Sequence, residues 1–303
     1  MTPLVIAFTP NYFVPAATML KSLLDSATGD FHVICLVTGD IPQRMQDKLV
    51  RMGEGRLDFE YINLGGRLAD VYTDPRYSEA ASFRLMLPEL LPEQDKVLYI
   101  DCDVILRQDV AKLYSETNLG DNWLGVVYEA PIEGQAARFE ALGCNPREYF
   151  NSGFLLMNLE QMRREKVSEK LLDACRVDWL EFPDQDALNQ VCQGHVVPLS
   201  PVNNSIRTFF LPQYKSDFIA QYGSEKLWVE VQTCGNIHYT GGKPWNLFTV
   251  QFGQWWKTYD SLPSEVKDEW TPNSKVLRIW KVYRTSFGRF FIDSMQNIYR
   301  KLK

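Results

Sequence analysis

Residues 4–37 read LVIAFTPNYFVPAATMLKSLLDSATGDFHVICLV, and this stretch decides the fold. It begins with an apolar run at 4–8 and ends with another at 32–37, both rich in the Val, Ile and Leu that fill buried strands. Between them, 14–27 has a helical pattern, with Pro15 suited to a first turn. Its apolar residues fall on one helical face, at Ala17, Leu20, Leu24 and Ala27. The stretch predicts a strand, a helix and a second strand.

The same alternation continues along the chain. A second helical pattern, QRMQDKLVRMG at 43–53, closes on Gly53. Four more apolar runs are expected strands: FEYINL (59–64), KVLYI (96–100), WLGVVY (123–128) and FLLMNL (154–159). The alternation predicts an α/β fold, a parallel sheet with helices on both faces. Ligands bind such sheets outside the carboxyl ends of the strands, which directs attention to 9–12, 101–103 and Glu129.

Composition and charge exclude several classes of protein. The chain has 303 residues, 45% of them hydrophobic and 23% charged, which is typical of a globular protein and not of a disordered, collagenous or coiled-coil one. A net charge of -6 argues against nucleic-acid binding by bulk attraction. The six cysteines form no CxxC pair, so we expect reduced thiols. The start of the chain lacks the pattern of a secretory signal, and no 18 apolar residues run together, so we expect a cytoplasmic protein.

The C-terminal end differs in kind from the rest. The turn-rich segment 261–274 is interpreted as a linker. The segment 275–303 carries eight Lys or Arg residues and one acid, Asp293, interleaved with aromatic and aliphatic residues. This pattern favours a basic amphipathic helix that lies in an anionic lipid surface. The alternative is a C-terminal helix docked on an acidic body.

The stretch LYIDCDV at 98–104 is the strongest chemical signal. Asp101 and Asp103 follow a buried strand with one residue between them, so both side chains leave one face of an extended segment, about 7 Å apart along it. Two carboxylates placed in this way suit one hard cation, either alone or with a diphosphate that shares its coordination sphere. A solvated turn is the alternative. A phosphatase with the first Asp as nucleophile is a further one, but such a site belongs near the start of a chain.

Three more clusters accompany this pair. NSGFLLMNL at 151–159 is a small polar turn that opens an apolar strand. PDQDALN at 183–189 starts a helix with acids in its first turn, where acids are ordinary capping residues. HYTGGKPW at 238–245 sets one of only three histidines before a Gly-Gly turn and a lysine, which suits a metal-binding imidazole followed by a phosphate-binding loop. A histidine taken alone is usually structural.

Taken in order, these motifs resemble the family 8 glycosyltransferases, the group that contains glycogenin and the bacterial lipopolysaccharide galactosyl- and glucosyltransferases. The α-galactosyltransferases of bacterial lipooligosaccharide are the most similar type. The resemblance covers nearly the whole chain: VIAFTPNYFVPAATMLKSLL, SFRLMLPELLP, KVLYIDCDVIL, LGDNWLGVV, YFNSGFLLMNL, DQDALN, HYTGGKPW and then a basic tail. It implies a Rossmann-like, GT-A type nucleotide-sugar fold in a single sheet-centred domain, with Mn²⁺ or Mg²⁺, a UDP-hexose donor and retention of anomeric configuration.

The resemblance also implies roles for particular residues. Asp101, Asp103 and His238 match the metal ligands, with the phosphates of UDP completing the sphere. Asp184 and Gln185 match the pair beside the sugar ring and are the candidate catalytic residues. We favour a same-face substitution in which the leaving phosphate takes the acceptor proton, because a neutral glutamine amide is a poor nucleophile.

Other positions match the family's contacts with the nucleotide sugar. Those near the uridine are Ala7, Thr9, Asn11, Tyr12, which is placed to stack on the uracil, and Cys102, through its backbone. Those near the sugar or the phosphates are Arg84, Asn151, Gly241 and Lys243. The chain departs from the family twice. Thr9 stands where members often carry an acid, and a hydroxyl accepts the uracil N3 proton more weakly than a carboxylate does. The loop between His238 and Lys243 is one residue shorter than is common.

The sequence therefore predicts a retaining, metal-dependent transferase that moves galactose or glucose from a UDP-sugar to lipopolysaccharide core or another cell-surface glycan. We expect a catalytic domain at 1–260, the linker at 261–274 and a membrane-associating tail at 275–303, which attaches the protein to the inner face of the cell membrane. A protein, teichoic or capsular acceptor is an alternative. A non-catalytic protein that binds a sugar nucleotide or a membrane is another.

Overall fold

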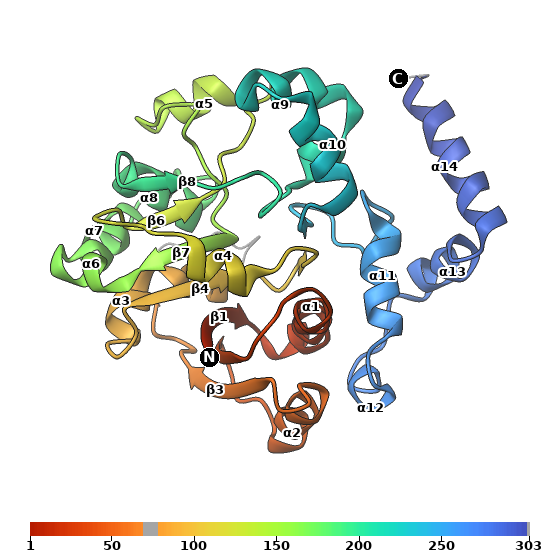
Figure 1. The fold of residues 1–303 in the computed structure, drawn as a ribbon, viewed down its shortest axis with the longest axis horizontal. Helices are drawn as coiled ribbons and strands as arrows, with labels where there is room; N and C mark the ends of the chain where they lie inside the picture. The colour runs from red at the N-terminus through yellow and green to blue at the C-terminus, as the bar shows by residue number, and fades with distance from the viewer. Residues whose placement is uncertain (69–77, 302–303) are drawn as a thin grey trace.

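A seven-stranded sheet forms the centre of the computed structural model, which describes residues 1–68 and 78–301 and the side chains up to Ser294 (Figure 1). The strand order is β3-β2-β1-β4-β7-β6-β8. The strands are β1 (Thr2–Phe8), β2 (Phe31–Val37), β3 (Leu57–Asn63), β4 (Lys96–Ile100), β6 (Leu124–Val126), β7 (Phe154–Asn158) and β8 (Val196–Pro198). The predicted α/β fold class is confirmed, and each of the six predicted strands belongs to this sheet.

The sheet is mixed, which corrects the prediction of a parallel one. Strands β3, β2, β1 and β4 are parallel, whereas β7 runs antiparallel to both β4 and β6. An apolar run gives no information about the direction of a strand, so the sequence could not show this reversal. The reversal matters for the site, because it brings the start of β7 to the edge where β1 and β4 end. Strand β8, which is parallel to β6, was not predicted.

A second, two-stranded sheet joins distant parts of the chain. Strand β5 (Val104–Ile105) pairs antiparallel with β9 (Ile237–His238), and Val104 lies opposite His238. Neither strand was predicted, because two residues are too few to form a pattern. The pairing sets His238 beside the residues that follow β4.

Helices cover both faces of the sheet, as predicted. The helices of the N-terminal half are α1 (Phe13–Ser26), α2 (Gln43–Met52), α3 (Leu87–Leu90), α4 (Val110–Glu116) and α5 (Gln135–Ala141), with the 3-10 helices η1 (Pro10–Tyr12) and η2 (Glu79–Met86). Those that follow are α6 (Leu159–Arg164), α7 (Val167–Ala174), α8 (Pro183–Cys192), η3 (Arg207–Phe210), η4 (Pro212–Tyr214), α9 (Lys215–Tyr222), α10 (Glu225–Cys234), α11 (Phe252–Asp260), α12 (Ser264–Lys267), α13 (Ser274–Tyr283) and α14 (Ser286–Lys301).

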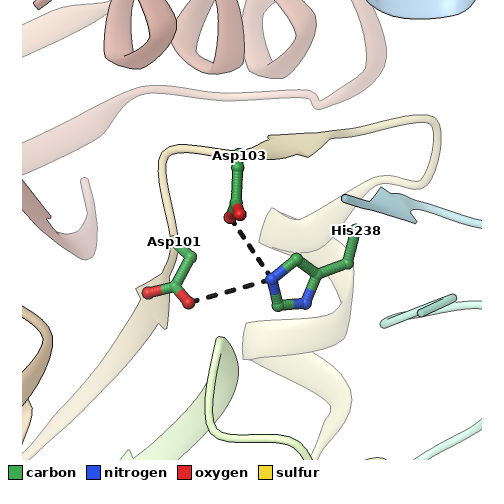
Figure 2. Close-up of side chains that lie close together, drawn as sticks. All are labelled: Asp101, Asp103 and His238. Atoms are coloured by element: carbon green, nitrogen blue, oxygen red, sulfur yellow. Dashed lines mark ion pairs between the residues drawn. The ribbon is translucent and has the colours of Figure 1, made fainter. Parts of the chain in front are cut away.

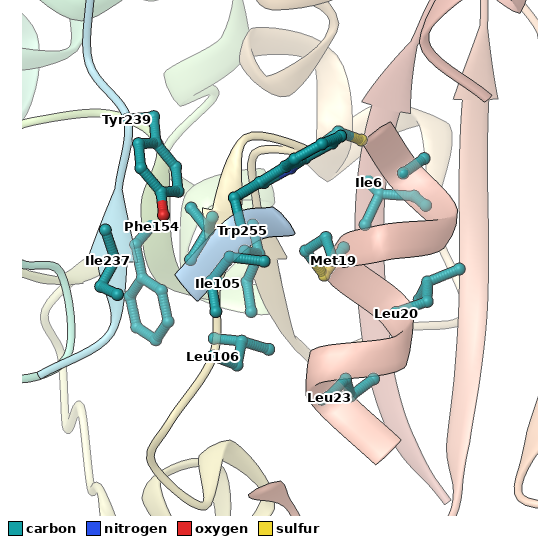
Figure 3. Packing of buried hydrophobic residues seen from close by; sticks show 14 of the residues in the cluster. Ile6, Met19, Leu20, Leu23, Ile105, Leu106, Phe154, Ile237, Tyr239 and Trp255 are labelled. Carbon is teal, nitrogen blue, oxygen red and sulfur yellow. The ribbon is translucent and has the colours of Figure 1, made fainter. Parts of the chain in front are cut away.

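Alternate residues of the strands face opposite sides of the sheet and pack into two hydrophobic cores. In β1, Leu4 and Ile6 face the core formed with α1 and α11, while Val5 faces the core formed with η2 and α8. Figure 3 shows Met19 of α1 near Trp255 of α11, so the helix is covered on its outer side as well. This burial of both sides explains why α1 is apolar around most of its circumference.

The segment 261–274, predicted as a linker, contains α12 and is docked on α2. Val266 is fully buried, Glu265 pairs with Arg51, and Glu269 pairs with Lys48. These contacts place the segment against the sheet-centred body. The proposed division into domains remains a prediction.

The basic tail has two parts with different environments. Helix α13 is docked on the body, where Val276 and Trp280 are buried and the Trp280 indole donates to Asp260 at 3.0 Å. Helix α14 extends away from the body (Figure 1). Among the described residues, we find no helix with the length and apolar character needed to cross a membrane.

Candidate active site

A cleft of about 1060 Å³ opens at the edge of the sheet where β1 and β4 end and β7 begins. Nearly all the residues to which the sequence assigned roles line it: Ala7, Thr9, Tyr12, Arg84, Asp101, Cys102, Asp103, Asn151, Asp184, Gln185, His238, Gly241 and Lys243. Asn11 is the exception, since it is exposed on η1 and does not line the cleft. Six separate stretches of the sequence therefore converge on one place.

Asp101, Asp103 and His238 meet at one side of this cleft (Figure 2). One ligand atom from each lies within 4.8 Å of the others. The Nε2 atom of His238 is 3.2 Å from Oδ1 of Asp103 and 3.8 Å from Oδ2 of Asp101. The antiparallel pairing of β5 with β9 explains the meeting, because it holds the imidazole opposite the turn that carries the two carboxylates.

The two oxygens of Asp101 have different surroundings. Its Oδ1 accepts hydrogen bonds from Nη2 of Arg84 at 2.9 Å and from the hydroxyl of Tyr99 at 2.9 Å. The guanidinium of Arg84 is itself buried and lies over the ring of Tyr99. These contacts hold the carboxylate so that Oδ2 is the oxygen turned toward His238.

Asp103 is buried and charged. Burial alone would raise its pKa, but Lys243 and His238 outweigh this effect and hold the pKa of Asp103 well below its ordinary value. Its Oδ2 accepts from the ammonium of Lys243. Its Oδ1 has no hydrogen-bond partner in the described part of the chain.

These residues fit a divalent cation. A buried carboxylate oxygen without a hydrogen bond calls for a partner, and a cation is one. Two carboxylates and one imidazole form a donor set suited to Mn²⁺ or Mg²⁺. Gly153 provides the room, since a Cβ atom at this position would lie 2.3 Å from Cε1 of His238 and 2.4 Å from Oδ2 of Asp101.

The first turn of α8 places Asp184 and Gln185 at the cleft. Asp184 accepts from the hydroxyl of Ser152 at 3.1 Å and lies 3.3 Å from Nε of Arg84. Burial raises the pKa of Asp184, and Arg84 opposes this rise. The amide oxygen of Gln185 accepts from Asn151 at 2.9 Å and from the backbone N–H of Ser152 at 3.1 Å. This oxygen is therefore already engaged by two donors.

The third acid of that turn has a structural role. Asp186 is fully buried, and its Oδ2 accepts from the backbone N–H groups of Glu181 and Phe182 at 3.1 and 3.0 Å. It also pairs with Arg138 at 2.6 Å. Asp186 therefore ties the segment before α8 to the first turn of the helix, whereas its neighbours Asp184 and Gln185 face the cleft.

Six further residues that line the cleft received no role from the sequence: Glu129, Arg138, Tyr149, Phe182, Arg207 and Thr208. Glu129 was singled out as a residue that follows a predicted strand, but no role was assigned to it. Burial raises its pKa to about 7, although the hydrogen bond from Gln185 opposes the rise. The others lie on short helices and loops, where their residue types alone carry no signal.

Comparison with known proteins identifies the family of the chain. The model of glycosyl transferase family 8 matches residues 3–248, and the chain belongs to this family. It is an enzyme that transfers a sugar to a saccharide acceptor, as the sequence predicted. General stress protein A of Bacillus subtilis (strain 168) is 24% identical over 254 residues, which are 78% of this chain and 84% of that protein. Lipopolysaccharide glucosyltransferase WaaO of Escherichia coli (strain K12) is 26% identical over 247 residues, which are 78% of this chain and 70% of that protein.

A solved structure confirms the GT-A-like fold. The galactosyltransferase LgtC, in complex with donor and acceptor sugar analogs, superposes with a TM-score of 0.72 and 26% identity. The similarity covers 89% of this chain and 100% of that one. The central, mostly parallel sheet and its helices are thus the scaffold of a glycosyltransferase.

Proposed function

We propose that this enzyme transfers galactose or glucose from a UDP-sugar to a saccharide acceptor, with retention of anomeric configuration and with Mn²⁺ or Mg²⁺ as its cofactor. The cluster of Asp101, Asp103 and His238 at the ligand edge of the sheet is the observation that carries the proposal. The names of similar proteins support it, since WaaO is a lipopolysaccharide glucosyltransferase and LgtC a galactosyltransferase.

The chemistry requires that negative charge on a leaving diphosphate be stabilised as the bond from the sugar to the phosphate breaks. Asp101, Asp103 and His238 would hold a divalent cation, which would supply Lewis-acid stabilisation of that charge. Lys243 is close enough to the same carboxylate to supply a second positive charge. Asp184, held by Ser152 and Arg84, is placed to orient a hydroxyl of the donor sugar.

We propose a same-face substitution. The bond from C1 to the phosphate oxygen breaks while the acceptor oxygen bonds to C1 on the same face, and the acceptor proton passes to the leaving phosphate. The surroundings of Gln185 support this route, because its oxygen already accepts two hydrogen bonds and its amide donates to Glu129 at 3.2 Å and Tyr149 at 3.1 Å. Gln185 then shapes the site and need not attack the sugar.

We also propose that the acceptor is linked to lipid and that the enzyme works in the cytoplasm, bound to the inner face of the cell membrane. The support is helix α14, which exposes Phe287, Phe290 and Phe291 on a segment rich in Lys and Arg. Aromatic side chains and cations together favour an anionic lipid surface. We propose lipopolysaccharide core as the acceptor, because it is linked to lipid, which fits a membrane-binding tail, and because WaaO is named for lipopolysaccharide.

The test is a UDP-release screen with UDP-glucose, UDP-galactose and UDP-N-acetylhexosamines, each with and without Mn²⁺. We expect release with a UDP-hexose that depends on the metal and is lost in Asp103→Asn, because one ligand carboxylate is gone. Full activity with EDTA, or in that variant, would contradict the metal-dependent function.

For Gln185→Ala we expect a lower kcat with donor affinity largely kept.

A further inference from the structure

The imidazole of His238 is held from behind by Asn204. The Nδ1 atom of His238 is 2.9 Å from Oδ1 of Asn204, and the side chain of Asn204 is fully buried. A carboxamide oxygen only accepts hydrogen bonds, so Nδ1 of the ring must carry the proton. Nε2 is then the ring nitrogen left free to bind a metal, and it is the one turned toward Asp101 and Asp103.

The orientation of Asn204 is itself determined by a second bond. Its Nδ2 donates to Oδ1 of Asn151 at 3.0 Å, and the same oxygen accepts from the backbone N–H of Gly153 at 3.1 Å. If the amide of Asn204 flipped, its oxygen would face Oδ1 of Asn151, which must be an acceptor because the backbone N–H of Gly153 donates to it. The bond to Asn151 would be lost, so the amide has one acceptable orientation.

The chain of amides continues to Gln185. Nδ2 of Asn151 donates to Oε1 of Gln185 at 2.9 Å, and the NH₂ group of Gln185 donates to Glu129 and Tyr149. Every amide thus donates in the same direction, from His238 toward Glu129 and Tyr149. The Asn151, Asn204 and Gln185 side chains are all at least nine-tenths buried, where an unpaired amide group is costly.

We propose that Asn204 is a positioning residue for sugar transfer, which presents Nε2 of His238 to the metal with one end of its amide and orients Gln185, through Asn151, with the other. This inference rests on the proposed function, since it takes His238 as a metal ligand. Hydrogen-bond partners behind a ligating histidine fix its tautomer, and their loss typically weakens metal binding about 10–100-fold.

Two variants separate the two ends of the amide. Leu at this position is close in size to Asn but removes both hydrogen bonds. Asp keeps an acceptor for Nδ1–H but cannot donate to Asn151. Asn203→Leu is the matched control, because Asn203 is also buried and its amide donates to the backbone oxygen of Ser200 at 3.2 Å.

Binding of Mn²⁺ alone is measured by electron paramagnetic resonance, and kcat with the UDP-hexose is measured beside it. We expect Asn204→Leu to bind Mn²⁺ about 10–100-fold more weakly than the wild type. For Asn204→Asp we expect Mn²⁺ affinity at or above that of the wild type but a reduced kcat, because Gln185 is no longer held. The control should match the wild type in Mn²⁺ affinity.

Nitrogen-15 spectra of the histidines give a further test, which uses the wild type and needs no variant. Under conditions in which the ring of His238 is neutral, we expect its proton on Nδ1. A proton on Nε2, wild-type Mn²⁺ affinity in Asn204→Leu, or equal loss of affinity in Asn204→Asp would each overturn the inference and leave the metal site standing. If Asp103→Asn bound Mn²⁺ as the wild type does, the proposed metal site would fail and this inference with it.

Discussion

Glu129 lines the cleft, where burial raises the pKa of its carboxyl to about 7. In the unfolded chain a glutamate has a pKa near about 4.3. The folded protein therefore binds this proton more tightly than the unfolded chain does. The stability that it contributes is fully present below the unfolded value, declines as pH rises toward 7 and is lost above it.

Glu129→Gln should therefore stabilise the protein at pH 8 and not at pH 4. Because the carboxyl is only partly shielded, the gain is nearer to about 1 kcal/mol than to the roughly 3 kcal/mol that the full shift would give. Thermal unfolding at both pH values measures it. Glu140→Gln, at an exposed position, is the control for the change in net charge. An equal change in Tm at both pH values would contradict this account of Glu129.

Lys243 sits on the metal carboxylate Asp103 and also donates to the backbone oxygen of Tyr239 at 2.8 Å. Its ammonium thus neutralises Asp103 and competes with any other cation for the same oxygen. In this structure Lys243 contacts Asp103 and Tyr239, whereas its contact with the diphosphate remains a prediction. Because of this competition, we expect that removal of Lys243 strengthens metal binding, although this residue matches a phosphate-binding lysine.

Lys243→Met should bind Mn²⁺ alone more tightly than the wild type does, while its transferase activity falls. It should also lower stability in EDTA by up to about 3 kcal/mol, because Asp103 is left buried without its partner. Added Mn²⁺ should reduce this loss. Thermal unfolding with EDTA or Mn²⁺ measures both effects, and the exposed Lys112→Met serves as control. An unchanged Tm in EDTA would show that the pair contributes nothing.

At the scale of elements, the site depends on a strand that runs against its neighbours. The NSG turn precedes β7, and only the antiparallel direction of β7 brings Gly153 to the edge where β4 ends. The backbone N–H of Asp101 donates to the oxygen of Gly153 at 2.8 Å. The two segments are in contact, so the side chain at 153 determines how much room the ligands have.

Gly153→Ala should weaken Mn²⁺ binding about tenfold or more while the fold is kept. The added Cβ would clash with His238 and with Asp101, one of which must move. The Mn²⁺ titration of the wild type and variant is the measurement. Gly39→Ala is a suitable control, since a Cβ there would meet only Cγ of Pro10 at 3.5 Å. Wild-type affinity in Gly153→Ala would contradict the described placement of the ligands.

Much of the fold could be predicted, because long apolar runs and helical periodicity are local signals. The six strands, α1 and α2 were foreseen from such runs, whereas the convergence of Asp101, Asp103 and His238 was implied by the resemblance to family 8. The direction of β7 could not be, since it depends on tertiary pairing. Asn204 and Tyr99 were missed for another reason: an asparagine in a loop or a tyrosine in a strand is ordinary, and only contacts reveal its role.

At the scale of the whole molecule, one helix of the tail packs on the body of the protein and the next is exposed to solvent. Trp280 of α13 is buried against α11, so this part of the tail is docked, whereas α14 exposes three phenylalanines and its binding to a membrane remains a proposal. Deleting 275–303 would remove core packing together with the exposed face. Substitution within α14 is therefore the cleaner test of membrane attachment.

The triple variant Phe287→Ser, Phe290→Ser, Phe291→Ser should weaken binding to anionic vesicles at least about 100-fold, because each ring contributes on the order of 1.5–3 kcal/mol when buried in lipid. Activity on a soluble acceptor should not change, since α14 lies apart from β1, β4 and α8, which carry residues of the cleft (Figure 1). Vesicle sedimentation measures the binding. Val50→Ser, at another exposed apolar position, is the control. If the triple variant sedimented with the vesicles as the wild type does, the proposal that α14 binds the membrane would be wrong.

The metal site is the central claim, and a crystal grown with Mn²⁺ and a UDP-sugar tests it most directly. The measurement is the position of the manganese peak in an anomalous difference map. The account predicts a peak within about 2.0–2.6 Å of a carboxylate oxygen from Asp101, one from Asp103, and Nε2 of His238. A peak elsewhere, or a metal bound without His238, would contradict it.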